Sequence, residues 1–350
     1  MARRRVGLEG LVKTLISAQT GIVVIGRNEG ERLGRCLESV GGQGRVVYVD
    51  SGSSDGSIAR ARGLGAEVVE LDLSKPFTAA RARNAGFARL RELEPEVEFV
   101  QFVDGDCEIR ESWIDTAATA LRQDPTTTVV CGRLRERFPE KSIYNRMCDI
   151  GWDYPIGEIE ACGGLAMYRA SACVAASGFD DALIAGEEFE LCSRLRKAGG
   201  RVRRIDAEMA WHDVGITRFL QWWKRAVRSG FGSAEGWVLY DASTGAVHRR
   251  RVLRAVVWAA AVPVCILTSL TVGFWESSAW LASALLILLW CFNFVRLLLR
   301  EKRSRHDLAL AFWLAAFSTL GKFAELRGVA QYVFTRSQGR ATPIIEYRGA

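Results

Sequence analysis

The fold is decided by the stretch Val97-Glu98-Phe99-Val100-Gln101-Phe102-Val103-Asp104-Gly105-Asp106. Its apolar run is rich in Val and Phe and is followed at once by a polar turn, which predicts a buried β-strand that ends at Asp104. Two carboxylates separated by one glycine can reach a single hard cation and the phosphates bound to it. Since Asp-Gly turns are common, the function of Asp104 and Asp106 depends on the segments around them.

Strand-like and helix-like segments alternate upstream of this stretch. The predicted strands are residues 21–26, 46–50, 66–71 and 97–103, and the predicted helices are residues 29–40, 57–64 and 79–93. This alternation predicts an α/β fold with a mostly parallel, Rossmann-like sheet and helices on both faces. Ligands of such sheets gather beyond the carboxyl ends of the strands. Asn28, Asp50, Asp55 and Asp104 all lie at or just after such ends.

Two polar, glycine-rich loops follow the first two strands. They are Gly26-Arg27-Asn28-Glu29-Gly30 and Asp50-Ser51-Gly52-Ser53-Ser54-Asp55-Gly56. Their side chains and backbone N–H groups can cradle a nucleotide, although neither loop matches the dinucleotide fingerprint or the phosphate-loop lysine motif. A third segment, Phe77–Gly86, opens a helix, and its Arg81 and Asn84 can reach a pyrophosphate or position the metal loop. The alternative for Arg81 is a solvated charge on a helix.

The composition indicates what the basic clusters bind and in which cellular compartment the catalytic domain lies. The net charge of +7 comes largely from residues 1–5, 248–251 and 300–305, which flank apolar segments. Anionic lipid is therefore a better partner for these clusters than nucleic acid. The nine cysteines show no zinc spacing, and their apolar surroundings predict buried thiols in a reducing compartment. No signal-peptide core follows the basic start, so we expect a cytoplasmic catalytic domain.

Long apolar segments in the second half of the chain predict a membrane region. Residues 255–275 and 277–295 lack charge over about 20 residues each, long enough to cross a bilayer as a hairpin. The flanking cations place both ends of this hairpin on the cytoplasmic side of an inner or plasma membrane. A third segment, residues 308–321, is a third span or an interfacial helix. We expect an amphipathic helix over 1–20, a catalytic domain over 21–215, an interface helix and linker over 216–250, a transmembrane hairpin over 251–300, and the third helix and tail over 301–350.

The order of the motifs resembles family 2 of the glycosyltransferases. A strand ending near Asn-Glu, the Asp-Ser-Gly-Ser-Ser-Asp-Gly turn, the Arg-Asn-Ala-Gly helix and the strand ending in Asp-Gly-Asp occur in that family's order. The resemblance continues through Gly163-Gly164 and Ser177-Gly178-Phe179-Asp180, and covers residues 20–215. It implies a GT-A fold, a nucleotide-sugar donor (a UDP-sugar by default) and a divalent metal, Mn²⁺ or Mg²⁺. Ser51 stands where some relatives carry a second Asp near the nucleotide base.

The resemblance also implies catalytic and metal-binding residues downstream. Glu187-Glu188 resembles the family's Glu-Asp motif, with Glu188 at the position where the family more often has Asp. On that resemblance Glu188 is the expected catalytic base, with Glu187 beside it; the alternative is an acidic helix start that complements the dipole. The expected metal ligands are Asp106, Asp104 and His212, with Asp104 closer to the ribose; His212 can also be a structural histidine. Gly26, Asn28, Glu29, Asp50, Ser51, Asp55, Arg81, Asn84 and Asp104 are expected to bind the donor.

Together these features predict an inverting enzyme that acts at a membrane. Glu188 takes a proton from an acceptor hydroxyl, and the acceptor is a lipid-linked or membrane-proximal glycan in cell-envelope glycolipid or polysaccharide synthesis. Trp152, Asp153 and Tyr154 line the acceptor site or form a packed loop. The Gln-x-x-Arg-Trp motif of processive synthases is not matched at Gln221–Arg225, which favours non-processive transfer. The alternatives are a sugar nucleotidyltransferase and a non-catalytic membrane-bound scaffold.

Overall fold

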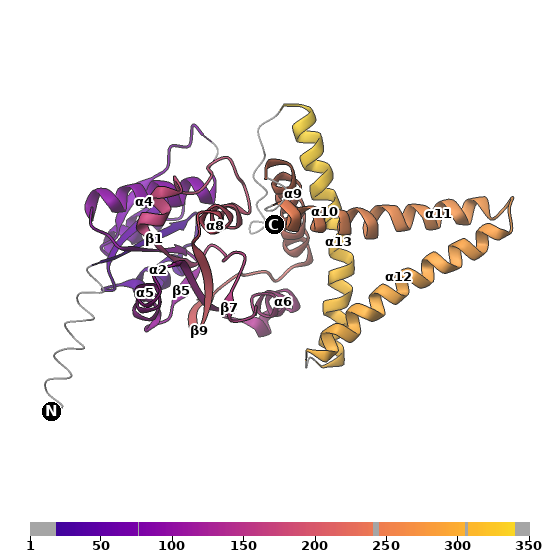
Figure 1. The fold of residues 1–350 in the computed structure, drawn as a ribbon, viewed down its shortest axis with the longest axis horizontal. Coiled ribbons are helices and arrows are strands. Elements are labelled where there is room, and N and C mark those ends of the chain that lie inside the picture. The colour runs from indigo at the N-terminus through magenta and orange to yellow at the C-terminus, as the bar shows by residue number, and fades with distance from the viewer. Residues whose placement is uncertain (1–18, 76, 241–244, 305–306, 340–350) are drawn as a thin grey trace. The chain divides into compact units, whose positions relative to one another are not determined.

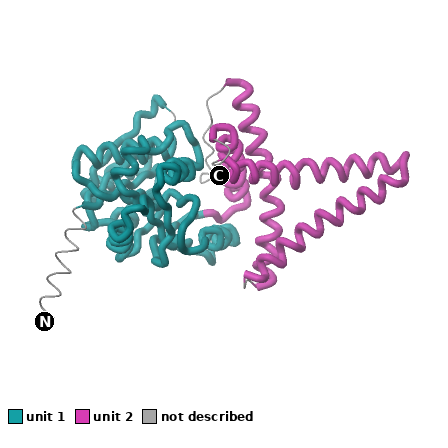
Figure 2. The backbone as a smooth tube through the Cα atoms, in the orientation of Figure 1, with its two compact units in different colours: residues 1–215 teal, residues 216–350 magenta. Residues whose placement is uncertain are grey.

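The computed structural model describes residues 19–75, 77–240, 245–304 and 307–339 and divides the chain into two compact units (Figure 2). Unit 1 comprises residues 1–215 and unit 2 residues 216–350. Residues 1–18 of the predicted N-terminal helix lie outside the described residues, and Thr20 already begins the first strand.

Unit 1 is built on one mixed, mostly parallel sheet with flanking helices (Figure 1), as the alternating pattern predicts. Its strand order is β3-β2-β1-β4-β8-β6-β9-β5, and β7 pairs with β9. The strands are β1 (Thr20–Gly26), β2 (Arg45–Asp50), β3 (Glu67–Glu70), β4 (Phe99–Asp104), β5 (Cys107–Ile109), β6 (Thr127–Glu136), β7 (Gly157–Glu158), β8 (Ala166–Arg169) and β9 (Arg201–His212). The helices are α2 (Glu31–Val40), α3 (Ser57–Gly63), α4 (Ala79–Leu93), α5 (Trp113–Gln123), η1 (Pro139–Lys141), α6 (Ile143–Gly151), α7 (Ala170–Ala175) and α8 (Glu187–Lys197).

The central strands are apolar on both faces because helices cover both sides of the sheet. Six of the seven residues of β1 are buried. On one side α4 approaches closely through Gly86, where an added Cβ would lie 2.4 Å from Val23 Cγ1 and 2.8 Å from Val49 Cγ2. Glycine is therefore required at this position for the helix to reach the sheet. The seven cysteines of this unit are buried and free, as predicted.

The pairing of strands carries distant segments to one edge of the sheet. Parallel pairing of β1 with β2 and β4 aligns Gly26 with Asp50, and Ile25 with Asp104. β8 is antiparallel to β4, with Phe102 opposite Ala166, so the chain before β8 lies beside the end of β4. β9 is antiparallel to β5, with Cys107 opposite His212. The register therefore places residues 163–164 and His212 next to the Asp104–Asp106 turn.

Unit 2 is helical within the described residues. Its helices are α9 (Phe219–Leu239), α10 (Gly245–Val256), the π-helical segment η2 (Val257–Ala261), α11 (Val262–Val272), α12 (Ser278–Arg303) and α13 (Leu308–Ser337). The helices α10, η2 and α11 follow one another without a break. The π-helical segment ends two residues before Pro263, and proline is a common cause of such a distortion.

Glycines set the packing of α9 against α13. A Cβ at Gly230 would lie 2.0 Å from the Glu325 carbonyl oxygen, and one at Gly328 would lie 2.0 Å from the Val227 carbonyl oxygen. The two backbones therefore touch, and no larger residue fits either position without moving a helix. Small residues that allow such close contact are typical of helix pairs in membranes.

Three helices of the described residues are long and apolar enough to cross a membrane: Gly245–Val272, Ser278–Arg303 and Leu308–Ser337. The first two extend the predicted hairpin at both ends. The third is a 30-residue helix, more than twice as long as the apolar segment 308–321. The charges beyond that segment are accommodated in part by an ion pair one turn apart, Lys322 Nζ to Glu325 Oε2 at 2.6 Å.

Candidate active site

Arg83 lies at the centre of an acidic cluster at the end of β4. Its guanidinium is 2% exposed and donates to Asp104 Oδ1 at 2.9 Å and to Glu187 Oε1 at 2.7 Å, while Glu188 Oε1 lies 3.4 Å away. The ring of Phe179 lies beneath the guanidinium, with the ring centroid 5.6 Å from Cζ. A buried cation that is shared by three carboxylates holds three separate segments together.

The helix α4 brings Arg83 to this point. Thr78 caps the helix by accepting a hydrogen bond from Arg81 N at 3.1 Å. Arg83 then shares a buried stripe with Gly86, Phe87 and Leu90, at the i, i+3, i+4 and i+7 spacing of one helix face. Arg81 lies off this stripe and reaches the carbonyl oxygens of Asp72 and Lys75 at 2.6 and 3.0 Å.

The two glutamates at the start of α8 have different surroundings. Glu187 is 4% exposed and is held by Arg83. The Glu188 side chain is 18% exposed, so it is the more accessible of the two to a substrate. The acidic first turn of α8 and its basic last turn also complement the helix dipole. Burial of the carboxyl, together with the charge of Glu187, raises the pKa of Glu188 to about 8, although Arg83 acts in the opposite direction.

Asp104 and Glu188 face the same point beside Gly164. A Cβ added to this glycine would lie 3.0 Å from Asp104 Oδ2 and 3.1 Å from Glu188 Oε1, and 2.2 Å from Arg83 Nη2. Gly164 lies two residues before β8, whose antiparallel pairing with β4 brings it here. Only glycine leaves this space beside the two carboxylates open.

Asp106 turns away from this cluster toward His212. Its Oδ2 lies 2.8 Å from His212 Nε2, and both side chains are largely buried. The indole of Trp152 stacks on the imidazole, with the ring centroids 4.7 Å apart and the planes 19° from parallel. The Asp106 carbonyl oxygen accepts a hydrogen bond from Asp213 N at 3.0 Å, which fixes the end of β9 to the turn.

The Asp106–His212 pair fits a divalent ion. Adjacent ligands of an octahedral ion with bonds of about 2.1 Å lie about 3.0 Å apart, close to the separation of Asp106 Oδ2 and His212 Nε2. The ligand atoms of Asp106, Cys107 and His212 lie within 4.8 Å of one another. A thiol is a soft ligand and suits Mn²⁺ or Mg²⁺ poorly, so the carboxylate and the imidazole are the candidate ligands. Asp104 pairs with Arg83 and is not one of this group of three.

The two glycine-rich loops are held to each other. Asn28 adopts a positive φ of 55°; its N–H donates to Ser53 Oγ at 2.9 Å and its Oδ1 accepts from Ser54 N at 2.8 Å. Asp55 Oδ2 accepts from Gly30 N at 2.9 Å. Although burial opposes it, hydrogen bonds from Ser57 and Gly30 lower the pKa of Asp55. The loops therefore form one surface at the ends of β1 and β2.

Several expected donor-binding residues support this surface from within. Asp50 is buried and accepts from Tyr48 Oη at 2.8 Å, Gly52 N at 2.9 Å and Ser53 N at 2.7 Å. Ser51 N donates to the Gly26 carbonyl oxygen at 3.1 Å. Glu29 forms an ion pair with Arg32 at 3.0 Å.

Asn84 is engaged away from the loops. Its Nδ2 donates to the Phe179 carbonyl oxygen at 2.7 Å and to Asp181 Oδ1 at 2.6 Å, and its Oδ1 accepts from Phe179 N at 2.9 Å. Asn84 thus fixes the Gly-Phe-Asp segment to α4. That contact also keeps the Phe179 ring beneath Arg83.

Comparison with known proteins agrees with this geometry. The sequence model described as glycosyl transferase family 2 matches residues 21–172, and that of glycosyl transferase family group 2 matches residues 147–298. Together the two matches span residues 21–298, so most of the chain is similar to the family 2 glycosyltransferases.

The individual relatives of the chain are distant. A pre-mycofactocin glycosyltransferase of Mycobacterium tuberculosis is 27% identical over 311 residues, covering 75% of this chain and 63% of the relative. This chain thus spans less than two thirds of that protein. A mannosyltransferase of Pyrobaculum calidifontis, solved with GDP-Man and Mn²⁺, is 14% identical and superposes with a TM-score of 0.53. The matched residues cover 91% of this chain and 88% of the mannosyltransferase. This second likeness concerns the GT-A fold.

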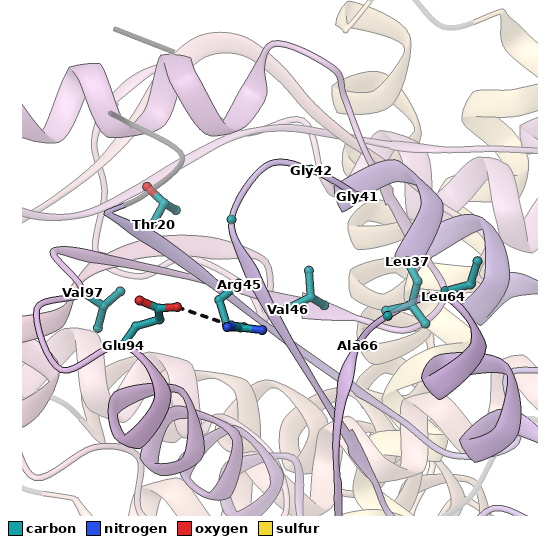
Figure 3. Close-up of a pocket in the computed structure, with 12 residues that line it drawn as sticks. Thr20, Leu37, Gly41, Gly42, Arg45, Val46, Leu64, Ala66, Glu94 and Val97 are labelled. Atoms are coloured by element: carbon teal, nitrogen blue, oxygen red, sulfur yellow. Dashed lines mark hydrogen bonds and ion pairs between the residues drawn. The ribbon is translucent and has the colours of Figure 1, made fainter. Parts of the chain in front are cut away.

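A hollow of about 440 Å³ lies at the other edge of the sheet (Figure 3). Thr20, Arg45 and Val97 line it, at or next to the amino ends of β1, β2 and β4. The exposed pair of Arg45 and Glu94, with Nε and Oε1 3.3 Å apart, borders it. Because ligands of such sheets bind at the carboxyl ends, this hollow is not the candidate active site.

Sequence reasoning missed one residue of the candidate site, Arg83, and one contact of another residue, Trp152. Arg83 was overlooked in favour of Arg81, although its spacing from Gly86, Phe87 and Leu90 marks it as inward-facing. Trp152 was expected to line an acceptor site, and its stacking on His212 was not foreseen. That contact depends on the approach of α6 to β9, and no local pattern in the sequence indicates it.

Proposed function

We propose that this protein is an inverting glycosyltransferase that moves one sugar from a nucleoside-diphosphate donor to a hydroxyl of a lipid-linked or membrane-proximal acceptor. The observation that carries the proposal is the convergence of Asp104 and Glu188 on the space beside Gly164. A carboxylate of the Asp-Gly-Asp turn and a partly exposed candidate base thus face one point. Similarity to the family 2 glycosyltransferases supports this reaction class.

The donor is proposed to rest on the joined loops at 26–30 and 50–56, which carry Gly26, Asn28, Glu29, Ser51 and Asp55. Asp104 is proposed to contact the ribose, while Asp50 shapes the loop through its three hydrogen bonds. Arg81 and Asn84 secure the segments on either side. Asp106 and His212 would hold a divalent ion, which supplies charge neutralisation of the diphosphate leaving group.

Glu188 is the proposed catalytic base. Its carboxylate accepts the proton of the acceptor hydroxyl, whose oxygen attacks the anomeric carbon as the nucleoside diphosphate leaves. A single displacement inverts the anomeric configuration. Arg83 balances the negative charge beside this base, and Glu187 holds Arg83 in place.

The membrane is proposed to present the acceptor. Three helices of unit 2 are long and apolar enough to cross a bilayer, and the basic clusters at 248–251 and 300–305 favour a cytoplasmic location for both ends of the hairpin. We place the protein in an inner or plasma membrane with unit 1 in the cytoplasm, acting in cell-envelope glycolipid or polysaccharide synthesis. The absence of a match to the processive motif at Gln221–Arg225 favours transfer of one sugar per encounter.

Donor binding and product analysis test the proposal. Purified full-length protein is mixed with UDP-glucose, UDP-N-acetylglucosamine or GDP-mannose, with and without Mn²⁺, and its thermal midpoint is measured. A bound donor raises the midpoint by mass action, and we expect a UDP-sugar to do so in a metal-dependent way. With a membrane-lipid extract as acceptor, nucleoside diphosphate and an inverted glycoside should form. Pyrophosphate would indicate a nucleotidyltransferase, retained configuration would contradict direct displacement, and donor binding without turnover would favour a scaffold.

A further inference from the structure

The C-terminal part of α12 carries a groove of about 540 Å³ with two kinds of lining. Phe292, Val295 and Leu299 form its apolar part. Arg296, Arg300 and Arg303 form its cationic part. A surface that combines an apolar strip with three guanidinium groups suits a ligand with an anionic head and a hydrocarbon tail.

Helix geometry gathers the three arginines on one face. Residues at i, i+4 and i+7 on a helix of 3.6 residues per turn fall within an arc of about 60°, and Arg296, Arg300 and Arg303 have this spacing. Phe292 lies one turn before Arg296 on the same side. The cations therefore form a row that continues the apolar strip toward the end of the helix.

The length of α12 places this row at the depth of lipid headgroups. At a rise of about 1.5 Å per residue, Arg296 lies about 27 Å along the axis from Ser278. The hydrocarbon core of a bilayer is about 30 Å thick. If α12 crosses the bilayer, Arg296 lies where the hydrocarbon ends, and Arg300 and Arg303 extend into the headgroup layer.

The local contacts leave the row positively charged. Arg296 Nη2 donates to the neutral amide oxygen of Asn293 at 3.0 Å. Arg300 pairs with Glu301, with Nε 2.9 Å from Oε1, but its side chain remains 66% exposed. Glu301 is the one acidic residue between Arg296 and Arg303, where Lys302 adds a further cation. Guanidinium groups bind phosphate oxygens through paired hydrogen bonds, so phosphate is the matching anion.

We propose that this groove is a binding site for one anionic phospholipid. The lipid phosphate lies among Arg296, Arg300 and Arg303, and an acyl chain follows Phe292, Val295 and Leu299. The site goes beyond sugar transfer and rests on the proposed membrane insertion of α12. It differs from diffuse attraction of cations to a membrane because it depends on the position of the charges and not only on their number.

Native mass spectrometry of the full chain released from nanodiscs tests this site. The nanodiscs contain phosphatidylcholine with a minority of phosphatidylglycerol, and the wild type should retain one phosphatidylglycerol. Since each cation near an anionic surface contributes about 1 kcal/mol, R296Q/R300Q/R303Q should weaken retention roughly a hundredfold. The matched control R249Q/R250Q/R251Q on α10 removes three exposed charges and should retain the lipid. An equal loss of phosphatidylglycerol in both variants would contradict a binding site that is local to Arg296, Arg300 and Arg303.

Further measurements distinguish the identity of the ligand, the folding of unit 1 and the membrane insertion of α12. R296K/R300K/R303K keeps the charge but not the planar fork, and should retain the lipid more weakly than the wild type and more strongly than the glutamine variant. Added inorganic phosphate should not displace the lipid, and displacement would show that a free phosphate suffices. Donor-induced thermal stabilisation of the same samples reports on unit 1, so a failure of the lipid site and a failure of sugar transfer are distinguishable. Absence of the protein from nanodiscs would contradict the insertion of α12.

Discussion

The two acidic groups at the end of β4 differ in how their charge is compensated. Asp104, Glu187 and Glu188 surround Arg83, a cation that the chain itself supplies. Asp106, two residues along, faces an imidazole in a geometry that suits two ligands of one ion. The first group contains its own cation, whereas the second, in our proposal, binds a divalent cation from outside. A single Asp-Gly-Asp turn thus divides its two carboxylates between the Arg83 group, which is the proposed base cluster, and the His212 pair, which is the proposed metal pair.

The largest expected effect comes from removing the internal cation. Arg83→Met should lower the free energy of unfolding by about 3–5 kcal/mol, because it leaves the buried Glu187 without its partner. Unfolding of purified full-length protein, followed by tryptophan fluorescence, measures the change. Arg89→Met is the matched control, since its pair with Glu67 is more than a third exposed and should contribute at most about 1 kcal/mol. Similar losses in the two variants would contradict the difference between the two acidic groups.

The pH dependence of transfer sharpens the assignment of the base. Glu188 must be ionised to accept a proton, so kcat/KM should rise about tenfold per pH unit up to about pH 8, where its pKa lies. Activity at pH 6 should thus be roughly a hundredfold below the plateau. Because the folded-state pKa is raised above 4.5, the protonated carboxyl stabilises the fold at low pH, and this contribution is lost as the pH rises toward 8. A flat activity profile between pH 6 and pH 8 would contradict the base assignment.

The smallest expected effect concerns the metal pair. Trp152→Ala removes the ring that stacks on His212, a contact of about 1 kcal/mol. The Mn²⁺ concentration for half-maximal activity should rise about fivefold, while the rate at saturating Mn²⁺ is retained. Tyr154→Ala is the control, because this ring contacts Arg204. If both variants change the metal requirement equally, Trp152 does not position His212.

The sequence was sufficient for the parts of the site that follow from strand ends and motif order. Asp104 and Asp106 close a buried strand, and the parallel sheet brings the two glycine-rich loops together beside it. These features depend on apolar runs and turns, which are local. The buried state of the cysteines followed from their apolar neighbours in the same way.

The remaining features depend on contacts between distant residues. Residues 131–215 show weak periodicity, yet β6, β8 and β9 from this region complete the sheet and carry Gly164 and His212 to the turn. Asp50 accepts three hydrogen bonds because of the way its loop folds, which the residue types alone do not indicate. The helix α13 continues well beyond its apolar segment, with the charges Lys322 and Glu325 paired on its surface.

The division of the Asp-Gly-Asp turn is tested most directly by comparing Glu188→Gln with Asp106→Asn. Donor-induced thermal stabilisation is measured with and without Mn²⁺, together with the rate of sugar transfer. Glu188→Gln should keep the Mn²⁺-dependent stabilisation while transfer falls by about 10²–10⁴-fold, the range for loss of a general base. Asp106→Asn should lose the Mn²⁺-dependent part of the stabilisation. Near-normal transfer in Glu188→Gln, or an unchanged Mn²⁺ effect in Asp106→Asn, would contradict separate roles for the two clusters.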